Sequence, residues 1–139
     1  MSFPFNVRVY GVLKFQGKIL LSKESYAGKT FTKFPGGALE FGEGLRDALV
    51  RELMEETGLK VRVVRHIYTT DFFQESAFNS EHQILSIYYQ IEQLASEDIL
   101  QEIEAKENDH HFFWVDCGVL SPDHLTFPID KYLCEKYLI

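Results

Sequence analysis

The stretch 37–59, which reads GALEFGEGLRDALVRELMEETGL, constrains the fold more than any other part of the chain. Within it, Leu45, Leu49 and Leu53 recur every four residues, a spacing that puts side chains on one face of an α-helix. Gly58 stands where helices commonly end in a left-handed residue. The pattern predicts an amphipathic helix over 44–57, whose leucine face must be buried against another layer of the protein.

The same helix carries three carboxylates on one face. Glu52, Glu55 and Glu56 are spaced i, i+3 and i+4, so they project together. Taken alone, three such glutamates usually form a solvated acidic surface, although like charges at this spacing repel. A hard cation offers a second explanation, because Mg²⁺ and Mn²⁺ prefer carboxylate oxygens and Mg²⁺ bridges carboxylates to substrate phosphates.

The residues around these acids favour the cation. Gly37, Glu43 and the run 51–59 (RELMEETGL) match the signature of the Nudix box without gaps, and Phe34-Pro35-Gly36 looks like that family's lead-in. The chain therefore resembles the Nudix hydrolases (MutT-like). The resemblance implies a Nudix-type pyrophosphohydrolase, which hydrolyses the diphosphate bond of a nucleoside diphosphate linked to a group X by attack of water on phosphorus.

The resemblance also implies roles for individual residues. Glu52, Glu55 and Glu56 correspond to the catalytic ligands of Mg²⁺ (or Mn²⁺), and the backbone carbonyl of Gly37 joins them. Glu43 and Arg51 correspond to an ion pair that holds the loop of the box against its helix.

Members of this family often take a further glutamate from a late loop as general base or metal ligand. We choose Glu107, because it lies closest before the predicted strand at 113–115. The other candidates in this loop are Glu102, Glu104, Asp109, His110 and His111.

The rest of the chain predicts a layered domain. Runs rich in β-branched and aromatic residues predict strands at 5–14, 18–23, 60–73, 82–92 and 112–115. Turns are expected at 16–17 and 34–37, loops at 25–33 and 74–81, a helix near 129–138, and either a loop or a short helix at 94–111. Strands outnumber helices, so we expect one α/β (α+β) domain over 1–139. By resemblance it has the Nudix fold, a mixed β-sheet sandwiched between helices with the box as a loop–helix–loop.

Composition limits the partners. A formal net charge of −7 argues against binding to a nucleic acid polymer, which needs many contacts from lysine and arginine to phosphate. No window approaches the ~18 apolar residues of a membrane span, and no signal peptide is evident. Cys117 and Cys134 form no metal-binding pair. We expect a cytoplasmic protein with a small nucleotide-like substrate, and the resemblance leaves a homodimer open.

Substrate-binding residues are weakly indicated. Lys23, Lys29 and Lys33 precede the box and could meet phosphate oxygens, and we choose Lys23 and Lys33, although most lysines are simply exposed. Phe72 is our choice for stacking on a base, although aromatic residues are more often core. Phe73, Phe78, His66 and His82 are weaker candidates.

Two other functions share parts of this pattern. A Nudix-like sensor that binds a nucleotide without cleaving it would be expected to lack some of the box carboxylates, and here all of them are present. An isoprenoid diphosphate isomerase would need a cysteine and an acid in its pocket, which the late positions of Cys117 and Cys134 do not suggest. Nucleoside triphosphates, ADP-ribose and dinucleoside polyphosphates all remain open as substrates, as does the phosphorus that water attacks.

Overall fold

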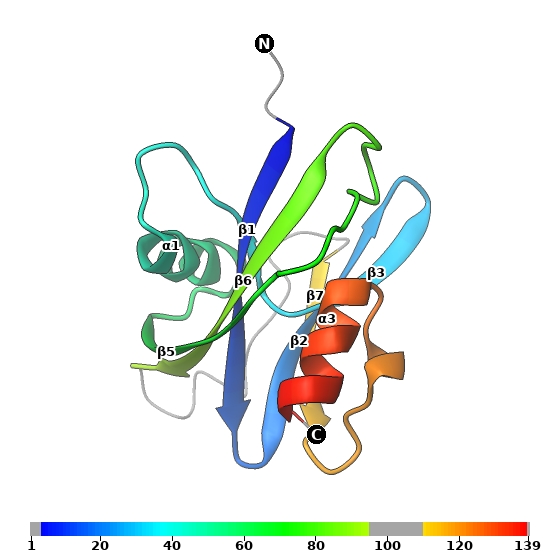
Figure 1. The fold of residues 1–139 in the computed structure, drawn as a ribbon. Coiled ribbons are helices and arrows are strands. Elements are labelled where there is room, and N and C mark those ends of the chain that lie inside the picture. The colour runs from blue at the N-terminus through cyan, green and yellow to red at the C-terminus, as the bar shows by residue number, and fades with distance from the viewer. Residues whose placement is uncertain (1–3, 95–109, 139) are drawn as a thin grey trace.

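The computed structural model describes residues 4–94 and 110–138, and within these ranges seven strands form a mixed sheet with helices on both faces (Figure 1). The strands are β1 (Phe5–Phe15), β2 (Lys18–Tyr26), β3 (Lys29–Lys33), β4 (Gly36–Ala38), β5 (Val61–Thr69), β6 (Gln83–Gln93) and β7 (His110–Asp116). The helices are α1 (Leu45–Thr57) and α3 (Pro128–Leu133), with a 3₁₀ turn at η1 (Pro122–His124) and a π-helical turn at η2 (Cys134–Leu138). The predicted sandwich of a mixed sheet between helices is confirmed.

The pairing of the central strands determines where the box lies. β1 and β6 are parallel neighbours in the middle of the sheet, and the strand order is β3-β2-β1-β6-β5. β2 pairs with β1 only next to their turn, where Phe15 is opposite Lys18, and farther along β2 pairs with β3 and β7 instead. The part of β1 that is not paired with β2 pairs instead with β4, where Tyr10 is opposite Gly36. The start of the box is therefore anchored at the centre of the sheet.

Successive side chains of a strand point to opposite faces of the sheet, so the sheet has two hydrophobic cores, one under each helix. On one face, α1 buries Leu49 and Leu53 against a cluster that includes Val9 of β1. On the other face, Leu133 of α3 packs in a second cluster with Tyr10, the next residue along β1. Each fully buried leucine stabilises its helix by roughly 1.5–3 kcal/mol, so packing rather than helix propensity holds α1 in place.

One predicted loop is wrong. Residues 25–33 form the end of β2 and all of β3, joined by a tight turn at Ala27-Gly28. Both turn residues have positive φ angles, 53° and 77°, which is the geometry that suits a two-residue hairpin. The polar, small residues of this segment were misleading because pairing with β2, rather than burial of an apolar face, makes β3 a strand.

Smaller differences concern boundaries. β5 ends at Thr69 rather than residue 73, β7 begins at residue 110, and the turn expected at 34–37 contains the start of β4. The α-helix expected near 129–138 ends at Leu133 and continues as η2. Most of the ambiguous segment 94–111 lies outside the described residues. Among those described, no helix has the length and apolar character needed to cross a bilayer.

Candidate active site

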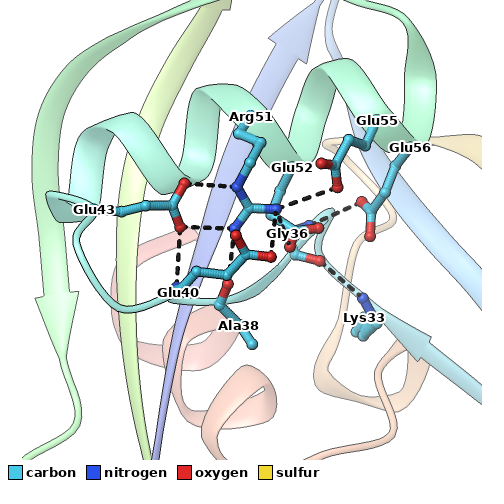
Figure 2. Close-up of polar contacts among 9 residues, drawn as sticks. All are labelled: Lys33, Gly36, Ala38, Glu40, Glu43, Arg51, Glu52, Glu55 and Glu56. Carbon is cyan, nitrogen blue, oxygen red and sulfur yellow. Dashed lines mark hydrogen bonds and ion pairs between the residues drawn. The ribbon is translucent and has the colours of Figure 1, made fainter.

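Helix α1 places its acidic face against the glycines of β4. The helix ends at Gly58, which has a φ of 76° and donates its backbone N–H to the carbonyl of Met54. Glu56, in the last turn, accepts a 3.2 Å hydrogen bond from the backbone N–H of Gly36 (Figure 2). The carboxylate of Glu52 lies so close to Gly37 that a Cβ atom there would be 2.6 Å from it. Only glycine allows this approach.

Arg51 braces the loop that leads into the helix. Its Nε and Nη2 donate to the two carboxylate oxygens of Glu43 at 2.6 and 2.8 Å, and Nη2 also donates to the carbonyl of Ala38 at 3.1 Å. The hydrogen bond from Arg51 lowers the pKa of Glu43, and the same bond raises the pKa of Arg51. A bidentate pair of this kind fixes orientation as well as distance, so the loop is tied to the helix at a defined position.

The remaining guanidinium nitrogen of Arg51 reaches the acidic face itself. Nη1 donates to Glu52 at 3.0 Å and to Glu55 at 3.2 Å. In this arrangement, no three acidic, histidine or cysteine side chains of residues 4–94 and 110–138 surround a common metal position. The side chain of Glu55 is 59% exposed, so it is free to turn from Arg51 toward Glu52 and Glu56. Three carboxylates of one helix face beside a glycine backbone form a donor set that suits Mg²⁺ or Mn²⁺.

The electrostatics of Glu56 agree with such a cation. Burial raises the pKa of Glu56 to about 7, and the nearby charge of Glu52 adds to this effect, while Lys33 and the Gly36 N–H oppose it. A carboxyl group in this position is costly to ionise without a further positive charge. A divalent cation would supply that charge and favour the ionised form.

A pocket of about 130 Å³ opens on the α3 side of the sheet, and its floor consists of alternating residues of the two central strands. Arg8 and Tyr10 come from β1, and their partners in the parallel ladder are Ser86 and Tyr88 of β6. Phe78, from the connection between β5 and β6, and Asp130, from the first turn of α3, also line it.

Lys33 connects this pocket to the acidic face. Its side chain is only 3% exposed, and its Nζ lies 3.5 Å from the carbonyl of Gly36 and 5.6 Å from the ring centre of Tyr10. Its positive charge acts to lower the pKa of both Glu56 and Asp130. Lys33 lines the pocket and lies beside Glu56. An anion bound between the pocket and the acidic face would therefore be attracted to the ammonium group of Lys33.

Apart from Phe78, the structure does not bring the other predicted lysines and phenylalanines to the pocket. Lys23 and Lys29 are exposed on the β2–β3 hairpin and do not line it. Phe72 packs edge-on against Tyr132 at 5.4 Å, and Phe73 is 72% exposed. Phe78, one of the weaker candidates in the sequence, is the phenylalanine of this group that lines the pocket.

Of the other histidines named from the sequence, His66, His82 and His111 do not line the pocket. His66 contacts Thr69 at 2.7 Å, His82 does not line the pocket, and His111 lies on β7 opposite Lys23. His110 begins β7. The candidates that lie outside the described residues are Glu102, Glu104, Glu107 and Asp109.

The pocket residues that sequence reasoning missed include Arg8, Tyr10, Tyr88 and Asp130. A signal for the first two was present, because polar and charged residues occupy every second position of the first strand, at 6, 8 and 10, between valines. Asp130 had no such signal, since an acid in the first turn of a helix is ordinarily explained by the helix dipole.

Comparison with proteins of known sequence gives several similar relatives, of which two are described. The chain is 40% identical over 67 residues to an ADP-ribose pyrophosphatase from Methanocaldococcus jannaschii, a match covering 46% of this chain and 40% of that protein. It is also 40% identical over 60 residues to the phosphatase NudJ of Escherichia coli K12, covering 43% of this chain and 39% of that one. The chain thus matches about two fifths of each relative's length.

Comparison with solved structures extends the similarity to the fold. The E. coli ORF135 protein superimposes with a TM-score of 0.75 at 23% identity, over 96% of this chain and 88% of that one. A MutT NUDIX hydrolase from Burkholderia pseudomallei gives 0.75 at 19% identity, over 96% and 98%. The sequence profile of the NUDIX domain matches residues 3–135. With the box, the sheet and the profile in agreement, the chain belongs to the NUDIX domain family.

Proposed function

We propose that this chain hydrolyses the diphosphate bond of a nucleoside diphosphate linked to a second group X, by attack of water on phosphorus. The observation that carries the proposal is the position of the acidic face of α1, where Glu52 and Glu56 lie against the Gly36–Gly37 backbone beside a buried lysine. Two of its relatives, named as an ADP-ribose pyrophosphatase and a phosphatase, belong to the same broad class of chemistry.

In this proposal each residue of the site has a separate role. Glu52, Glu55, Glu56 and the carbonyl of Gly37 would hold Mg²⁺ or Mn²⁺, which would supply charge neutralisation of the diphosphate and a more acidic bound water. Glu43 and Arg51 keep the loop and helix in register. Lys33 meets a phosphate oxygen as a point charge, and its burial keeps that charge poorly screened by solvent. Glu107 is our candidate for the general base.

The test is product release from a panel of nucleotides with Mg²⁺, including nucleoside triphosphates, ADP-ribose and dinucleoside polyphosphates. We expect Glu56→Gln to lower kcat/KM by at least ~100-fold, because loss of even an outer-shell partner of a metal ligand costs ~10–100-fold. Chelation of the metal should abolish turnover. Asp47→Asn is the matched control, since it removes an exposed carboxylate from the same helix and should change turnover less than about threefold.

The sensor alternative predicts a different result. A protein that only senses a nucleotide would bind one member of the panel and release no product in Mg²⁺ or Mn²⁺. Turnover that persists in Glu56→Gln would contradict the assignment of the metal site, because the acid that is bonded to the Gly36 N–H and acted on by the charge of Lys33 would then be dispensable.

A further inference from the structure

A second pocket, of about 70 Å³, lies at the end of the α3–η2 segment, whereas the larger pocket on the same side of the sheet lies at its start. Its floor spans three neighbouring strands, because Val12 of β1 is opposite Gln90 of β6 and Gln90 is opposite Arg65 of β5. Lys14, the next residue on this face of β1, and Tyr137 of η2 also line it. Within the described parts of the chain the two pockets have no lining residue in common, so this one is separate from the proposed hydrolytic site.

The polar groups of this second pocket are hydrogen-bond donors. Nε of Arg65 donates to Oε1 of Gln90 at 2.8 Å, which orients the guanidinium group and uses the acceptor of the amide. The donors that remain are the two terminal nitrogens of Arg65, the Nε2 of Gln90 and the Nζ of Lys14. None of them has a partner among residues 4–94 and 110–138. A ligand that supplies several acceptor oxygens complements such a set of donors.

The pocket is also positive, in a chain whose formal net charge is −7. Lys14 and Arg65 both line it, and none of its described lining residues is acidic. Glu92, the next residue on this face of β6, forms an ion pair with Arg62 instead. Cations near the end of a helix can serve to complement its dipole, but no hydrogen bond joins these two to a carbonyl of η2 within the described residues. The unpaired charge therefore favours an anionic ligand.

The size of the pocket points to a single phosphate group. Its 70 Å³ is roughly twice the ~30 Å³ that a water molecule occupies in the liquid, and well below the ~300–1,000 Å³ of pockets that enclose drug-sized ligands. A planar guanidinium group matches two oxygens of a phosphate, and a lysine adds a point charge. Tyr137 is 48% exposed, so its hydroxyl is able to turn toward a ligand as a further donor.

We propose that this pocket binds a phosphate group, held by the terminal nitrogens of Arg65 and the Nζ of Lys14, with the amide of Gln90 as a further donor. The proposal goes beyond the hydrolytic function and does not depend on it, because the residues are different and no metal takes part. Free inorganic phosphate and the phosphate of a monoester share this chemistry. Because the donors come from three strands and Tyr137 adds one from η2, a bound phosphate joins the α3–η2 segment to the sheet.

The test is a titration of the ¹⁵N-labelled protein with inorganic phosphate, at constant ionic strength and in a chelator, followed by the backbone amide resonances. We expect the amides around Lys14, Arg65 and Tyr137 to shift together and to saturate with a Kd on the order of 1 mM, since a few charge-assisted hydrogen bonds support binding of this strength. The amide of Gly36 reports separately on phosphate at the acidic face of α1.

Ribose 5-phosphate distinguishes the two sources of the ligand in the same titration. An affinity comparable to that of inorganic phosphate assigns the site to phosphate monoesters, whereas binding at least ~10-fold weaker assigns it to the free ion. Both results support a phosphate site, and failure of both compounds to bind would overturn it.

Three variants test the residues. Arg65→Gln should weaken phosphate binding at least ~10-fold, because it removes the charge and the planar fork together. Arg65→Lys, which keeps the charge alone, should lie between this variant and wild type, and Lys14→Gln should weaken binding about threefold. Lys60→Gln is the matched control, since it removes one exposed cation just before β5 that does not line the pocket, and it should change the Kd less than about twofold.

Several results would overturn the proposal: amide shifts that do not saturate, shifts confined to Gly36 and its neighbours, or a loss of affinity in Lys60→Gln equal to that in Arg65→Gln. If Arg65→Gln perturbs the fold, which its own amide spectrum shows, Lys14→Gln and the set of shifted amides in wild type decide. Arg65→Gln should keep kcat/KM for a nucleotide substrate within about threefold of wild type. Absence of turnover would therefore refute the hydrolase and leave the phosphate site standing, and absence of phosphate binding would do the reverse.

Discussion

At the scale of single residues, Gly37 decides where the acids of the box can be. Its backbone φ is not in the positive range, so the need for glycine does not come from backbone conformation. It comes from contact, since a Cβ atom would lie 2.6 Å from the Glu52 carboxylate. The glycine therefore acts on the site through space rather than through chain flexibility.

Gly37→Ala should consequently displace the Glu52 carboxylate without unfolding the protein. We expect affinity for Mn²⁺, followed by electron paramagnetic resonance, to fall by about 10–100-fold, with a similar loss in kcat/KM and little change in the unfolding midpoint. Gly44→Ala is the control, because the added Cβ there meets only the Asp47 side chain, at 3.1 Å. Unchanged Mn²⁺ binding in Gly37→Ala would show that the Glu52 carboxylate is not a metal ligand.

At the scale of elements, two hairpins connect β1 to β2 and β2 to β3. The turn of each hairpin places a residue other than glycine in the left-handed region. Gln16 has a φ of 50° and Ala27 a φ of 53°, each followed by a glycine. Asparagine tolerates this conformation better than alanine or glutamine does, because its short polar side chain can hydrogen-bond locally. These turns are therefore sites where local conformation opposes the fold.

Ala27→Asn should raise the free energy of unfolding by about 0.5–1 kcal/mol, as measured by urea denaturation. Ser25→Asn is the control, since this exposed residue of the same hairpin does not have a positive φ and should show no gain. Equal effects at the two positions would mean that the turn conformation is not the cause.

At the scale of the whole molecule, the bond between Asp130 and Tyr88 ties α3 to the central strand β6 across two layers. Burial raises the pKa of Asp130 to about 6 from its ordinary 3.8, although Tyr88, Lys33 and Arg8 all favour the ionised form. A carboxyl group with a higher pKa in the folded state holds its proton more tightly there than in the unfolded chain. Its stabilising contribution is therefore complete below about pH 4 and is lost as the pH rises to about 6.

This linkage predicts how Asp130→Asn changes with pH. Relative to wild type, the variant should gain stability as the pH rises from 4 to 7, by on the order of 3 kcal/mol. Urea denaturation at several pH values measures the difference, and taking the difference cancels the titration of the other acids. Asp123→Asn, which removes an exposed acid of the nearby 3₁₀ turn, is the control variant. A constant difference for Asp130→Asn would place its folded pKa near the ordinary value.

The sequence by itself determined the features that depend on local spacing. The leucine period predicted α1 and its buried face, and the spacing of Glu52, Glu55 and Glu56 predicted that they share another face. Gly58 predicted the end of the helix, because a left-handed residue is a local requirement. The alternation of strands and one strong helix was enough for the layered architecture.

Only the tertiary structure decided which distant residues meet. Lys33 and Lys23 look equivalent in the sequence, but strand pairing buries the first beside Glu56 and exposes the second. β3 is a strand because of its partner rather than its composition. Asp130 and Tyr88 are 42 residues apart and come together because α3 packs on β6. Such contacts depend on the register and layering of the whole sheet, which no short stretch of sequence contains.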